Sequence, residues 1–451
     1  MIKIKNIVLL TLASSALSGC GLYTKFQHTP SSEIVDNLYT YTEPSSEDES
    51  LAALSWQELF TDSHLQTLIN QALACNTDLN VARLSVEQAE VALRTARLSY
   101  LPSLGFGADA SSSSSGVSGY SLSLAASWEI DIFGKIRNAK EQQQAALLQS
   151  EAYEQLIKTE LIATIANNYY SLMLLDEQLR ISALSLEAWS ANIRSLEALN
   201  RAGRVDKTSI LQAKANQASL ESSIVTLEQQ CAELENTLSS LLGTPAVTIE
   251  RGAWSEISLD REISIGVPLE MVGNRPDVQV AEYALAQAYY ATSIARASLY
   301  PSLTLGGSAA YTSEFGAVSN PSDVIFTAVA SVVQPIFYQR SLRGAAEISE
   351  SQQQQALLQF NQAILDAGAE VNSALIGWQS AIKRSDYYQQ QIELLEDALR
   401  SSELLMKHGN INYLEVLTAQ QSLLSAQLSY SSNQYEQLQS VISLYRSLGG
   451  R

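Results

Sequence analysis

Two stretches of this 451-residue chain repeat one another at a fixed distance, and this duplication limits the possible folds more than any other feature. Four motifs recur 199 positions further along: Asp78-Leu79 as Asp277-Val278, Ala89 as Ala288, Ala96-Arg97 as Ala295-Arg296, and Pro102-Ser103-Leu104 as Pro301-Ser302-Leu303. Beyond them the spacing drifts through small insertions while the order holds. Repetition at a fixed offset indicates two copies of one structural unit in tandem.

Each copy is predicted to contain a helix, a β-hairpin, a long helix and a shorter helix. In the first copy, residues 63–243, we expect the helix at 63–98, strands at about 100–110 and 119–132, and helices that end near 200 and 242. In the second copy, residues 275–451, we expect the helix at 276–298, strands at about 300–312 and 324–336, and helices at 342–406 and 411–447. A linker at residues 244–274, with Pro245 and Pro268, breaks the helical pattern between them.

The long helix of the first copy carries an apolar stripe. Residues 135–242 are rich in residues that favour helix. Large apolar residues recur at two heptad positions, at Ile165, Leu172, Leu179, Leu186 and Ile193 and at Leu161, Leu175, Trp189 and Leu196. Sustained heptads predict helices that pack on one another as in a coiled coil. A helix from about 135 to 200 would be about 100 Å long, which no compact globular domain accommodates.

The second predicted strand alternates between apolar and polar side chains. Its apolar positions are Tyr120, Leu122, Leu124, Ala126, Trp128, Ile130 and Ile132. The other strands alternate more loosely, through Leu104, Phe106 and Ala108, through Leu303, Leu305, Ala309 and Tyr311, and through Phe326, Ala328, Ala330 and Val332. Such alternation is typical of a transmembrane strand with one face on lipid and one on water. A soluble, half-buried hairpin would show the same pattern.

Four transmembrane strands in one chain cannot close into a barrel. Open sheet edges are not stable in lipid, and known barrels begin at about eight strands. A channel must therefore be shared between chains, so that a trimer would supply about twelve strands and a dimer about eight. No long apolar run follows the first twenty residues, so any further crossing of a membrane would be made by strands.

The N-terminus has the features of a secretory signal. Lys3 and Lys5 precede a short apolar run at residues 7–13, and small residues then lead to Leu17-Ser18-Gly19-Cys20. The run is too short to span a bilayer. The ending L-S-G-C resembles a bacterial lipobox, in which the cysteine becomes the acylated first residue. An ordinary signal peptide with a chance cysteine is the alternative.

The lipobox predicts how the N-terminal region is processed. Residues 1–19 are expected to be a signal peptide, and Cys20 is expected to carry the lipid. Residues 20–62 would then form a lipidated N-terminal segment anchored in membrane lipid. Gly21 follows the cysteine where an aspartate would resemble a signal for inner-membrane retention, so we expect the outer membrane as the destination.

Composition argues against nucleic-acid binding, metal binding and catalysis. The net charge is −19, and no basic stripe would attract nucleic acid. His28, His64 and His408 lack ligand spacing, so no metal and no cofactor are expected. No catalytic motif such as G-x-S-x-G or H-E-x-x-H occurs, so no catalytic residue is expected either. Cys75 and Cys231 lie in separate helical segments and are expected to be single thiols, although a periplasmic disulfide is chemically allowed.

Several motifs occur in the order of one known family. They are Trp56-Gln57-Glu58-Leu59-Phe60 with Asp62, Asn76 with Asp78-Leu79, Ser127-Trp128-Glu129-Ile130-Asp131-Ile132-Phe133-Gly134, and Asn274-Arg275-Pro276-Asp277-Val278. Together with the duplicated frame, they make the chain similar to the TolC-like outer-membrane factors of tripartite efflux pumps, in their lipoprotein branch. The resemblance covers nearly the whole chain after the signal peptide.

The resemblance implies a fold, a localisation and partners. The fold would be mainly α with a transmembrane β part, and a homotrimer would form a 12-stranded β-barrel continuous with a 12-helix periplasmic α-barrel. The N-terminal segment, the linker and the C-terminus would form an equatorial belt. A periplasmic adaptor and an inner-membrane transporter, usually of the resistance-nodulation-division class, would dock to this passive, gated exit duct for small molecules. The transported substrate is not implied.

Two glycines mark the turns between the long and the short helices. Gly203 and Gly409 each follow a long helix at equivalent places in the two copies. A glycine ends a helix readily because it accepts the left-handed backbone conformation. Both turns are expected at the periplasmic tip, where an adaptor would touch them.

The residues after these turns are candidates for a periplasmic gate. Members of the family often have aspartate where this chain has Ser209 and Thr418, so the acidic constriction implied by the resemblance does not carry over directly. Glu415, one turn before Thr418, would supply an acidic ring instead. Asp206, Ser209 and Asn412 would form the polar contacts that hold the tip closed. Alternatively, Glu415 is an exposed helix charge that faces the periplasm.

Three other functions fit parts of the sequence. An outer-membrane channel for type I protein secretion belongs to the same family, although a lipobox is less usual there. A coiled-coil lipoprotein that only tethers the envelope belongs to a different class, and it would need no lipid-facing strands. A lipid-anchored enzyme is disfavoured because the sequence lacks catalytic motifs.

Overall fold

The computed structural model describes residues 24–27, 55–112, 118–256, 273–314, 324–334, 338–407 and 413–450. The chain divides into two compact units. Unit 1 comprises the described residues within 1–31, 82–153 and 277–363, and unit 2 comprises those within 32–81, 154–276 and 364–451. Each unit therefore combines residues of both sequence copies. The copy boundaries at 63–243, 244–274 and 275–451 remain predictions, and the signal peptide at 1–19 lies outside the described residues.

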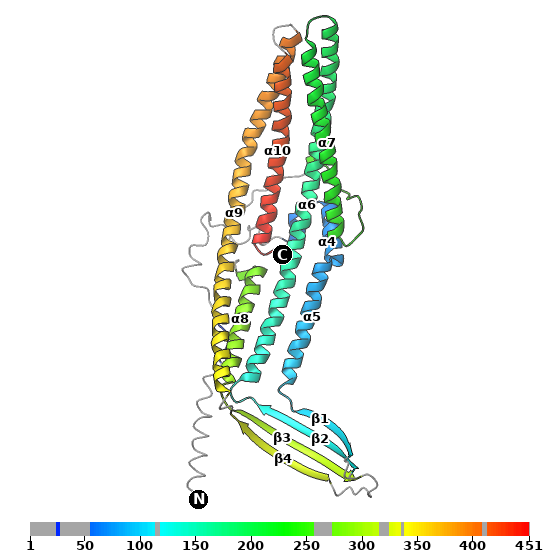
Figure 1. The fold of residues 1–451 in the computed structure, drawn as a ribbon. Helices are drawn as coiled ribbons and strands as arrows, with labels where there is room; N and C mark the ends of the chain where they lie inside the picture. Colours follow the sequence, from blue (N-terminus) through cyan, green and yellow to red (C-terminus); the bar gives the residue numbers. More distant parts are fainter. Residues whose placement is uncertain are drawn as a thin grey trace. The chain divides into compact units, whose positions relative to one another are not determined.

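The helices and strands follow the duplicated plan (Figure 1). The first copy contains α3 (Trp56–Leu59), α4 (Ser63–Cys75), α5 (Thr77–Leu98), β1 (Ser103–Ser112), β2 (Ser118–Ile130), α6 (Lys135–Arg201) and α7 (Lys207–Leu241). The second copy contains α8 (Pro276–Ala297), β3 (Ser302–Glu314), β4 (Val324–Val333), α9 (Gln339–Lys407) and α10 (Tyr413–Ser447). The predicted repeat of helix, hairpin, long helix and shorter helix is confirmed.

The prediction of one continuous helix at residues 63–98 is wrong, because α4 and α5 are separate helices that meet at Asn76. The backbone of Asn76 is extended, with ψ 132°, and this ends α4. Its buried side chain accepts a hydrogen bond from the N–H of Leu79 at 3.0 Å and donates one to the carbonyl of Leu241 at 3.1 Å. Asn76 thereby satisfies one of the N–H groups that the first turn of α5 leaves without a helical partner.

Unit 1 contains an antiparallel four-stranded sheet in the order β1-β2-β3-β4. One row of paired residues crosses the sheet through Phe106, Leu124, Ala309 and Phe326. Since alternate residues of a strand point to opposite faces, this row lies on one face of the sheet. The same face holds Leu104, Ala108, Tyr120, Leu122, Ala126, Trp128, Ile130, Leu303, Leu305, Tyr311, Ala328, Ala330 and Val332. The apolar residues of the predicted alternation within the strands therefore share one face.

The apolar face of the sheet is open in the single chain. Leu104, Phe106 and Phe326 are 75%, 72% and 81% exposed. On the other face, β1, β2 and β3 place mainly serine, threonine and glycine. Strand β4 differs from the other three, because Ile325 and Val329 make its second face apolar as well.

The sheet has two open edges within the described chain. β1 pairs only with β2, and β4 pairs only with β3. The outer N–H and C=O groups of such edge strands readily pair with another strand. Among the helices of the described residues, none is long and apolar enough to cross a membrane.

A short turn converts β2 into α6. The carboxylate of Asp131 accepts hydrogen bonds from the N–H groups of Ile136 at 3.1 Å and Arg137 at 2.8 Å. These are two of the donors that the first turn of a helix leaves without helical partners. Gly134 adopts φ +78° just before the helix, a conformation that favours glycine. The S-W-E-I-D-I-F-G motif thus fixes where the strand becomes a helix.

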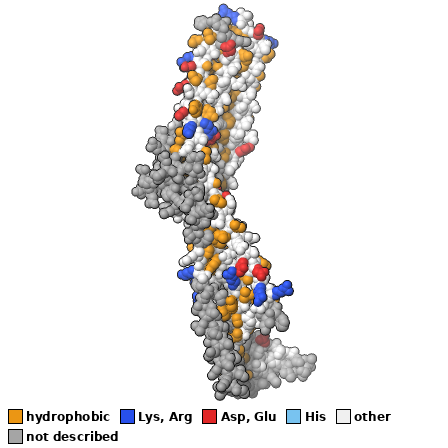
Figure 2. Space-filling model, turned by 90° about the vertical axis from the view of Figure 1, so that its left-hand side faces the viewer, with side chains coloured by type: hydrophobic (Ala, Val, Ile, Leu, Met, Phe, Trp, Pro, Cys, Tyr) orange, Lys and Arg blue, Asp and Glu red, His pale blue; other side chains and the backbone are white. Residues whose placement is uncertain are grey.

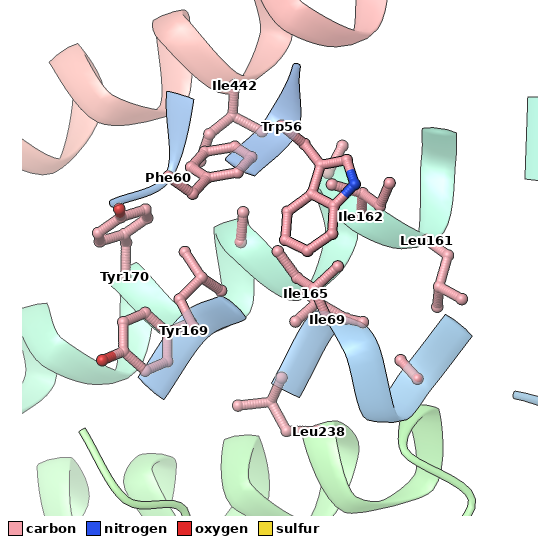
Figure 3. Close-up of a cluster of buried hydrophobic side chains, with 14 of the residues drawn as sticks. Trp56, Phe60, Ile69, Leu161, Ile162, Ile165, Tyr169, Tyr170, Leu238 and Ile442 are labelled. Atoms are coloured by element: carbon pink, nitrogen blue, oxygen red, sulfur yellow. The ribbon is translucent and has the colours of Figure 1, made fainter. Parts of the chain in front are cut away.

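Unit 2 is built around a hydrophobic core (Figure 3). Trp56 and Ile69 come from the N-terminal helices, Ile165 from α6, Leu238 from α7 and Ile442 from α10. The nine heptad residues of α6 are all buried or half-buried, and several belong to this core. The predicted helix-on-helix packing of α6 is therefore confirmed.

Candidate functional site

The turn between α6 and α7 stops the long helix by a defined hydrogen-bond pattern. Gly203 has φ +70°, and a Cβ there would meet no atom within 4 Å, so the backbone conformation rather than crowding favours glycine. The N–H of Arg204 donates to the carbonyl of Leu199 at 3.0 Å, and the N–H of Gly203 donates to that of Asn200 at 2.9 Å. This is a Schellman motif, which satisfies carbonyls at a helix end. The location of the turn at the periplasmic tip remains a prediction.

The corresponding turn between α9 and α10 contains Gly409 and Asn412, which lie outside the described residues. α10 begins at Tyr413, and Glu415 lies exposed in its first turn. The hydroxyl of Thr418 is exposed and donates a hydrogen bond to the carbonyl of Leu414 at 2.8 Å. Because its proton is used within its own helix, Thr418 can only accept a hydrogen bond from a neighbouring helix.

The first turns of α7 and α10 pack together in an apolar cluster that we call the tip cluster. Its buried members are Ile193, Leu196, Ile210, Ala213, Tyr413, Val416 and Leu417. Leu196 and Val416 are fully buried, and burial raises the pKa of Tyr413. The tip cluster therefore holds the ends of the two helical hairpins side by side.

The tip cluster defines the surroundings of the predicted gate residues. Ser209 is half-buried and directly precedes Ile210 of the cluster, while the exposed Glu415 directly precedes Val416. Asp206 is exposed at the N-cap of α7, where its backbone is extended. These residues thus lie on neighbouring helices, and the gate contacts among them remain a prediction.

An ion-pair network in unit 2 connects the segment after α7 to two helices. The guanidinium of Arg251 binds the carboxylate of Asp176 on α6 at 2.5 and 3.0 Å and that of Glu235 on α7 at 2.6 Å. The hydrogen bond to Asp176, followed by that to Glu235, holds the pKa of Arg251 above its usual range against the opposing effect of burial. Arg251 therefore stays charged and fixes this segment on the helices.

A tyrosine joins the N-terminal segment to the segment after α7. The hydroxyl of Tyr169 donates to the carboxylate of Asp62 at 2.5 Å and accepts a hydrogen bond from the N–H of Gly252 at 3.2 Å. Burial, followed by the bond to Asp62, raises the pKa of Tyr169. The indole N–H of Trp254 donates to Gln434 of α10 at 3.0 Å. These contacts bring together two of the segments expected in the equatorial belt, the N-terminal segment and the linker, and hold them on α6 and α10.

Arg275, from the Asn-Arg-Pro-Asp motif, closes the C-terminal end of α10. Its buried guanidinium donates to the carbonyls of Ser447 at 2.9 Å and Ala367 at 3.3 Å, and it binds the carboxylate of Glu370 at 2.8 Å. The carbonyl of Ser447, the last residue of the helix, has no partner within the helix itself. The resemblance singled out this motif, whereas nothing in the sequence pointed to Arg251.

A short N-terminal segment lies on α8 in unit 1. The hydroxyl of Tyr289 donates to the carbonyl of Thr24 at 3.2 Å, and the ring of Phe26 lies 5.7 Å from the ring of Tyr289. Cys20, four residues before Thr24, lies outside the described residues. Within the described residues, Cys75 and Cys231 are free thiols, and no group of three His, Cys, Asp or Glu side chains is placed to hold a metal.

These features define a class of protein: a channel subunit with a small apolar sheet and paired long helical hairpins. Residues 68–244 and 267–450 match the outer membrane efflux protein family. The chain belongs to this family.

Individual relatives and solved structures agree with the family. The pyoverdine export outer membrane protein OpmQ of Pseudomonas putida is 31% identical over 90% of this chain and 90% of its own length. The cation efflux system protein CusC of Escherichia coli K12 is 27% identical over 96% of this chain and 97% of its own. The solved structure of CusC is similar to this fold with a TM-score of 0.81 at 26% identity, covering 92% of this chain and all of that one. The open MtrE channel of Neisseria gonorrhoeae gives a TM-score of 0.83 at 26% identity, covering 95% and 98%.

The comparisons decide between the functions considered for the sequence. The chain is an outer-membrane channel component of an efflux pump that extends into the periplasm, and it is not an enzyme. An envelope tether without a channel is thereby excluded. Members of the family form trimeric channels and work with adaptor proteins and inner-membrane transporters.

Proposed function

We propose that three copies of this chain form a passive exit duct, in which three sheets join into a 12-stranded β-barrel above a 12-helix periplasmic α-barrel. The sheet of unit 1 carries this proposal. It has two open edges and one exposed apolar face, and neither is stable in water. Pairing β4 of one copy with β1 of the next closes the edges, and lipid covers the apolar face.

Exposed apolar residues on the helices of unit 1 support contact between copies. On α5, which leads into β1, Leu84, Val91 and Leu98 recur every seventh residue and are more than half exposed. On α9, which follows β4, Ile348 and Leu358 are also more than half exposed. The two helices next to the open sheet edges thus carry apolar surface as well. A heptad stripe on a helix surface is a seam for another helix.

Unit 2 independently offers a similar surface. On α9, the exposed large apolar residues Leu365, Ile376, Tyr387, Leu394 and Leu405 follow one another at intervals of seven or eleven residues. Intervals of seven and eleven keep side chains on one side of a helix. On α7, Leu211 and Val225 are exposed fourteen residues apart, or two heptads. A second copy would cover these stripes.

The duct would work with a periplasmic adaptor and an inner-membrane transporter that supplies the energy. The names of the relatives include pyoverdine export for OpmQ and cation efflux for CusC, so one fold serves chemically different cargo. We infer that the transporter rather than this chain selects the substrate. The acidic composition of the chain would favour cations in the lumen.

The mass of the purified protein and its conductance test this proposal together. Native mass spectrometry in mild detergent should give three subunits, and the same preparation should conduct ions in a planar bilayer. A trimer that does not conduct would contradict the duct. A conducting monomer would contradict the shared barrel.

Cys20 is proposed as the lipidated residue, because it ends the L-S-G-C motif. Radiolabelled palmitate should be incorporated into the wild-type protein and not into Cys20→Ala. The variant should also accumulate as an uncleaved or soluble precursor. Label that persists in Cys20→Ala would place the lipid elsewhere.

Glu415 is proposed as the acidic ring of the gate, with Asp206, Ser209, Asn412 and Thr418 around it. It is exposed beside the tip cluster, and three copies near one axis would attract cations. Glu415→Ala should lower the preference for cations and weaken block by divalent cations in bilayer recordings. Asp386→Ala removes an exposed charge about six turns before the end of α9, outside the tip, and should leave both unchanged. Equal recordings from both variants would mean that Glu415 is only a solvated charge.

A further inference from the structure

The two helical hairpins end in tips of opposite charge. We define the first tip as residues 187–214 and the second tip as the described residues at the corresponding positions, 393–407 and 413–420. The first tip contains five basic and three acidic residues, a formal charge of +2. The second contains two basic and five acidic residues, a formal charge of −3. Two equivalent segments of one duplicated unit therefore differ by five charges.

The cations of the first tip lie on its surface. Arg194, Arg201, Arg204 and Lys207 are all exposed. Lys214, also exposed, binds Glu197 at 2.7 Å, and this bond lowers the pKa of Glu197. This pair removes one charge of each sign and leaves four exposed cations against two exposed carboxylates, Glu187 and Asp206. Figure 2 shows Lys and Arg side chains together with Asp and Glu side chains at this end of unit 2.

The second tip combines carboxylates with exposed leucines. Arg400 binds Asp397 at 3.6 Å, which removes one charge of each sign and leaves four carboxylates against Lys407. Leu394, Leu404, Leu405 and Leu414 are 64%, 53%, 43% and 59% exposed. In the described part of the first tip, Leu211 is the large apolar residue with comparable exposure. The second tip is thus an apolar surface with an acidic rim, formed by Glu393, Glu396, Glu403 and Glu415.

The tip cluster joins these unlike surfaces. It packs Ile210 and Ala213 of the first tip against Tyr413, Val416 and Leu417 of the second. A partner that reaches the end of one hairpin therefore meets the other hairpin as well. Exposed apolar residues with a polar rim are typical of a protein–protein contact, and complementary charge selects the partner and its register.

We propose that the first tip binds an acidic surface of the periplasmic adaptor and the second tip binds an apolar surface with a basic rim. This assignment rests on the proposed function, since only a subunit of an efflux duct needs the adaptor. In a trimer the tips would alternate in charge around the ring. An adaptor built from identical copies would then occupy two kinds of position, and a mismatched adaptor would be repelled at one of them.

Two designed helical-hairpin peptides test the assignment on the full-length channel in detergent. They have the same length and the same apolar residues, but one carries four Glu and the other four Lys at its turn. Binding to the immobilised channel is measured at low and at high salt. The Glu hairpin should bind to the first tip and the Lys hairpin to the second. Binding of both peptides should weaken at high salt, because salt screens the charges.

Charge reversal separates the two tips. Arg201→Glu combined with Arg204→Glu should weaken binding of the Glu hairpin to the channel by about tenfold or more. The same double variant should leave binding of the Lys hairpin unchanged. Glu396→Lys combined with Glu403→Lys should do the opposite. Lys383→Glu, an exposed position on α9 about 36 Å along the helix from its end, is the control and should change neither.

Two outcomes would overturn the assignment. One is that a single double variant weakens binding of both peptides equally, and the other is that no variant changes the binding of either peptide. Conductance in a planar bilayer is recorded for every variant. If the variants conduct like the wild type and the charge reversals do not change binding of the peptides, the docking assignment is wrong while the proposed duct remains supported. If the wild-type protein does not conduct, the proposed function itself fails.

Discussion

The sheet of unit 1 and the core of unit 2 place their large apolar side chains in opposite ways. In the sheet of unit 1, Phe106 and Phe326 are more than 70% exposed. In unit 2, Leu65, Ile165 and Leu172 are completely buried. Both sets consist of ordinary core-forming residue types. Hydrophobicity alone therefore does not decide where a side chain lies; the medium in contact with that part of the chain does.

The two regions also satisfy their polar groups differently. The sheet relies on backbone pairing between strands, which leaves the outer edges of β1 and β4 without a strand partner in the described chain. The helices of unit 2 satisfy their own backbone, so the connections between them depend on side chains such as Arg251 and Arg275. A charge on the wrong face should therefore damage the sheet most, whereas a cavity or a lost ion pair should damage unit 2 most.

The largest expected effect comes from a charge on the apolar face of the sheet. Leu124 and Ser123 are neighbours on β2 that point to opposite faces. Leu124→Lys would place an ammonium against lipid, which costs about 2–4 kcal/mol per chain at the middle of the bilayer. A trimer would carry this cost in each of its chains. We expect loss of the trimer from the outer-membrane fraction. Ser123→Lys, on the face proposed to line the lumen, should still assemble.

Both variants are compared by the amount of trimer on gels run without boiling. Normal assembly of Leu124→Lys would mean that this face does not contact lipid. Failure of Ser123→Lys alone would mean that the two faces are assigned the wrong way round.

A cavity in the core of unit 2 should have the next largest effect. Leu172 on α6 is fully buried, so Leu172→Ala should lower the free energy of unfolding by about 2–5 kcal/mol. Leu122 is 41% exposed on the apolar face of the sheet, and Leu122→Ala should cost less than about 1 kcal/mol in detergent. Guanidinium unfolding followed by circular dichroism measures both. Equal losses would show that detergent packs Leu122 as tightly as protein packs Leu172.

The ion-pair network should contribute less than the core. Arg251→Gln would leave Asp176 and Glu235 facing each other without a cation, at a cost of about 1–3 kcal/mol because the site is only partly buried. Lys135→Gln removes an exposed pair with Glu129 next to the sheet and should change stability by less than about 1 kcal/mol. The same unfolding experiment compares them, and a larger loss in Lys135→Gln would reverse the ranking.

The sequence predicted the repeated architecture well because two periodic patterns carry it. Alternation placed Leu104, Leu122 and Phe326 on one face, and heptads placed Ile165 and Leu172 in a helical seam. It did not predict the break at Asn76: the bond from the N–H of Leu79 to Asn76 is a local N-cap signal that was missed, while the bond to Leu241 spans 165 residues. A local pattern does not contain a contact of this range.

The candidate site was predictable only in part. Gly203 was recognisable because a glycine after a long helix commonly ends it. The Arg251 network was not, because its partners Asp176 and Glu235 lie on two helices whose pairing the sequence leaves open. The opposite charges of the tips are visible in the sequence, yet their meaning depends on the tip cluster that brings both turns together.

The smallest expected effect comes from a tyrosine in the core of unit 2. Burial, followed by the charge of Asp62, raises the pKa of Tyr170 to about 12, against about 10 in an unfolded chain. The folded state thus holds the proton more tightly, so the neutral hydroxyl contributes stability that is complete below pH 10 and is lost as pH rises through about 12. At pH 11 the wild-type protein should already have lost about 1 kcal/mol from this group. Tyr170→Phe, compared with the wild type at pH 8 to remove the effect of packing, should lose less stability between pH 8 and pH 11. An identical loss in both proteins would show that Tyr170 does not titrate in the folded core, and the alkaline sensitivity would then belong to other groups.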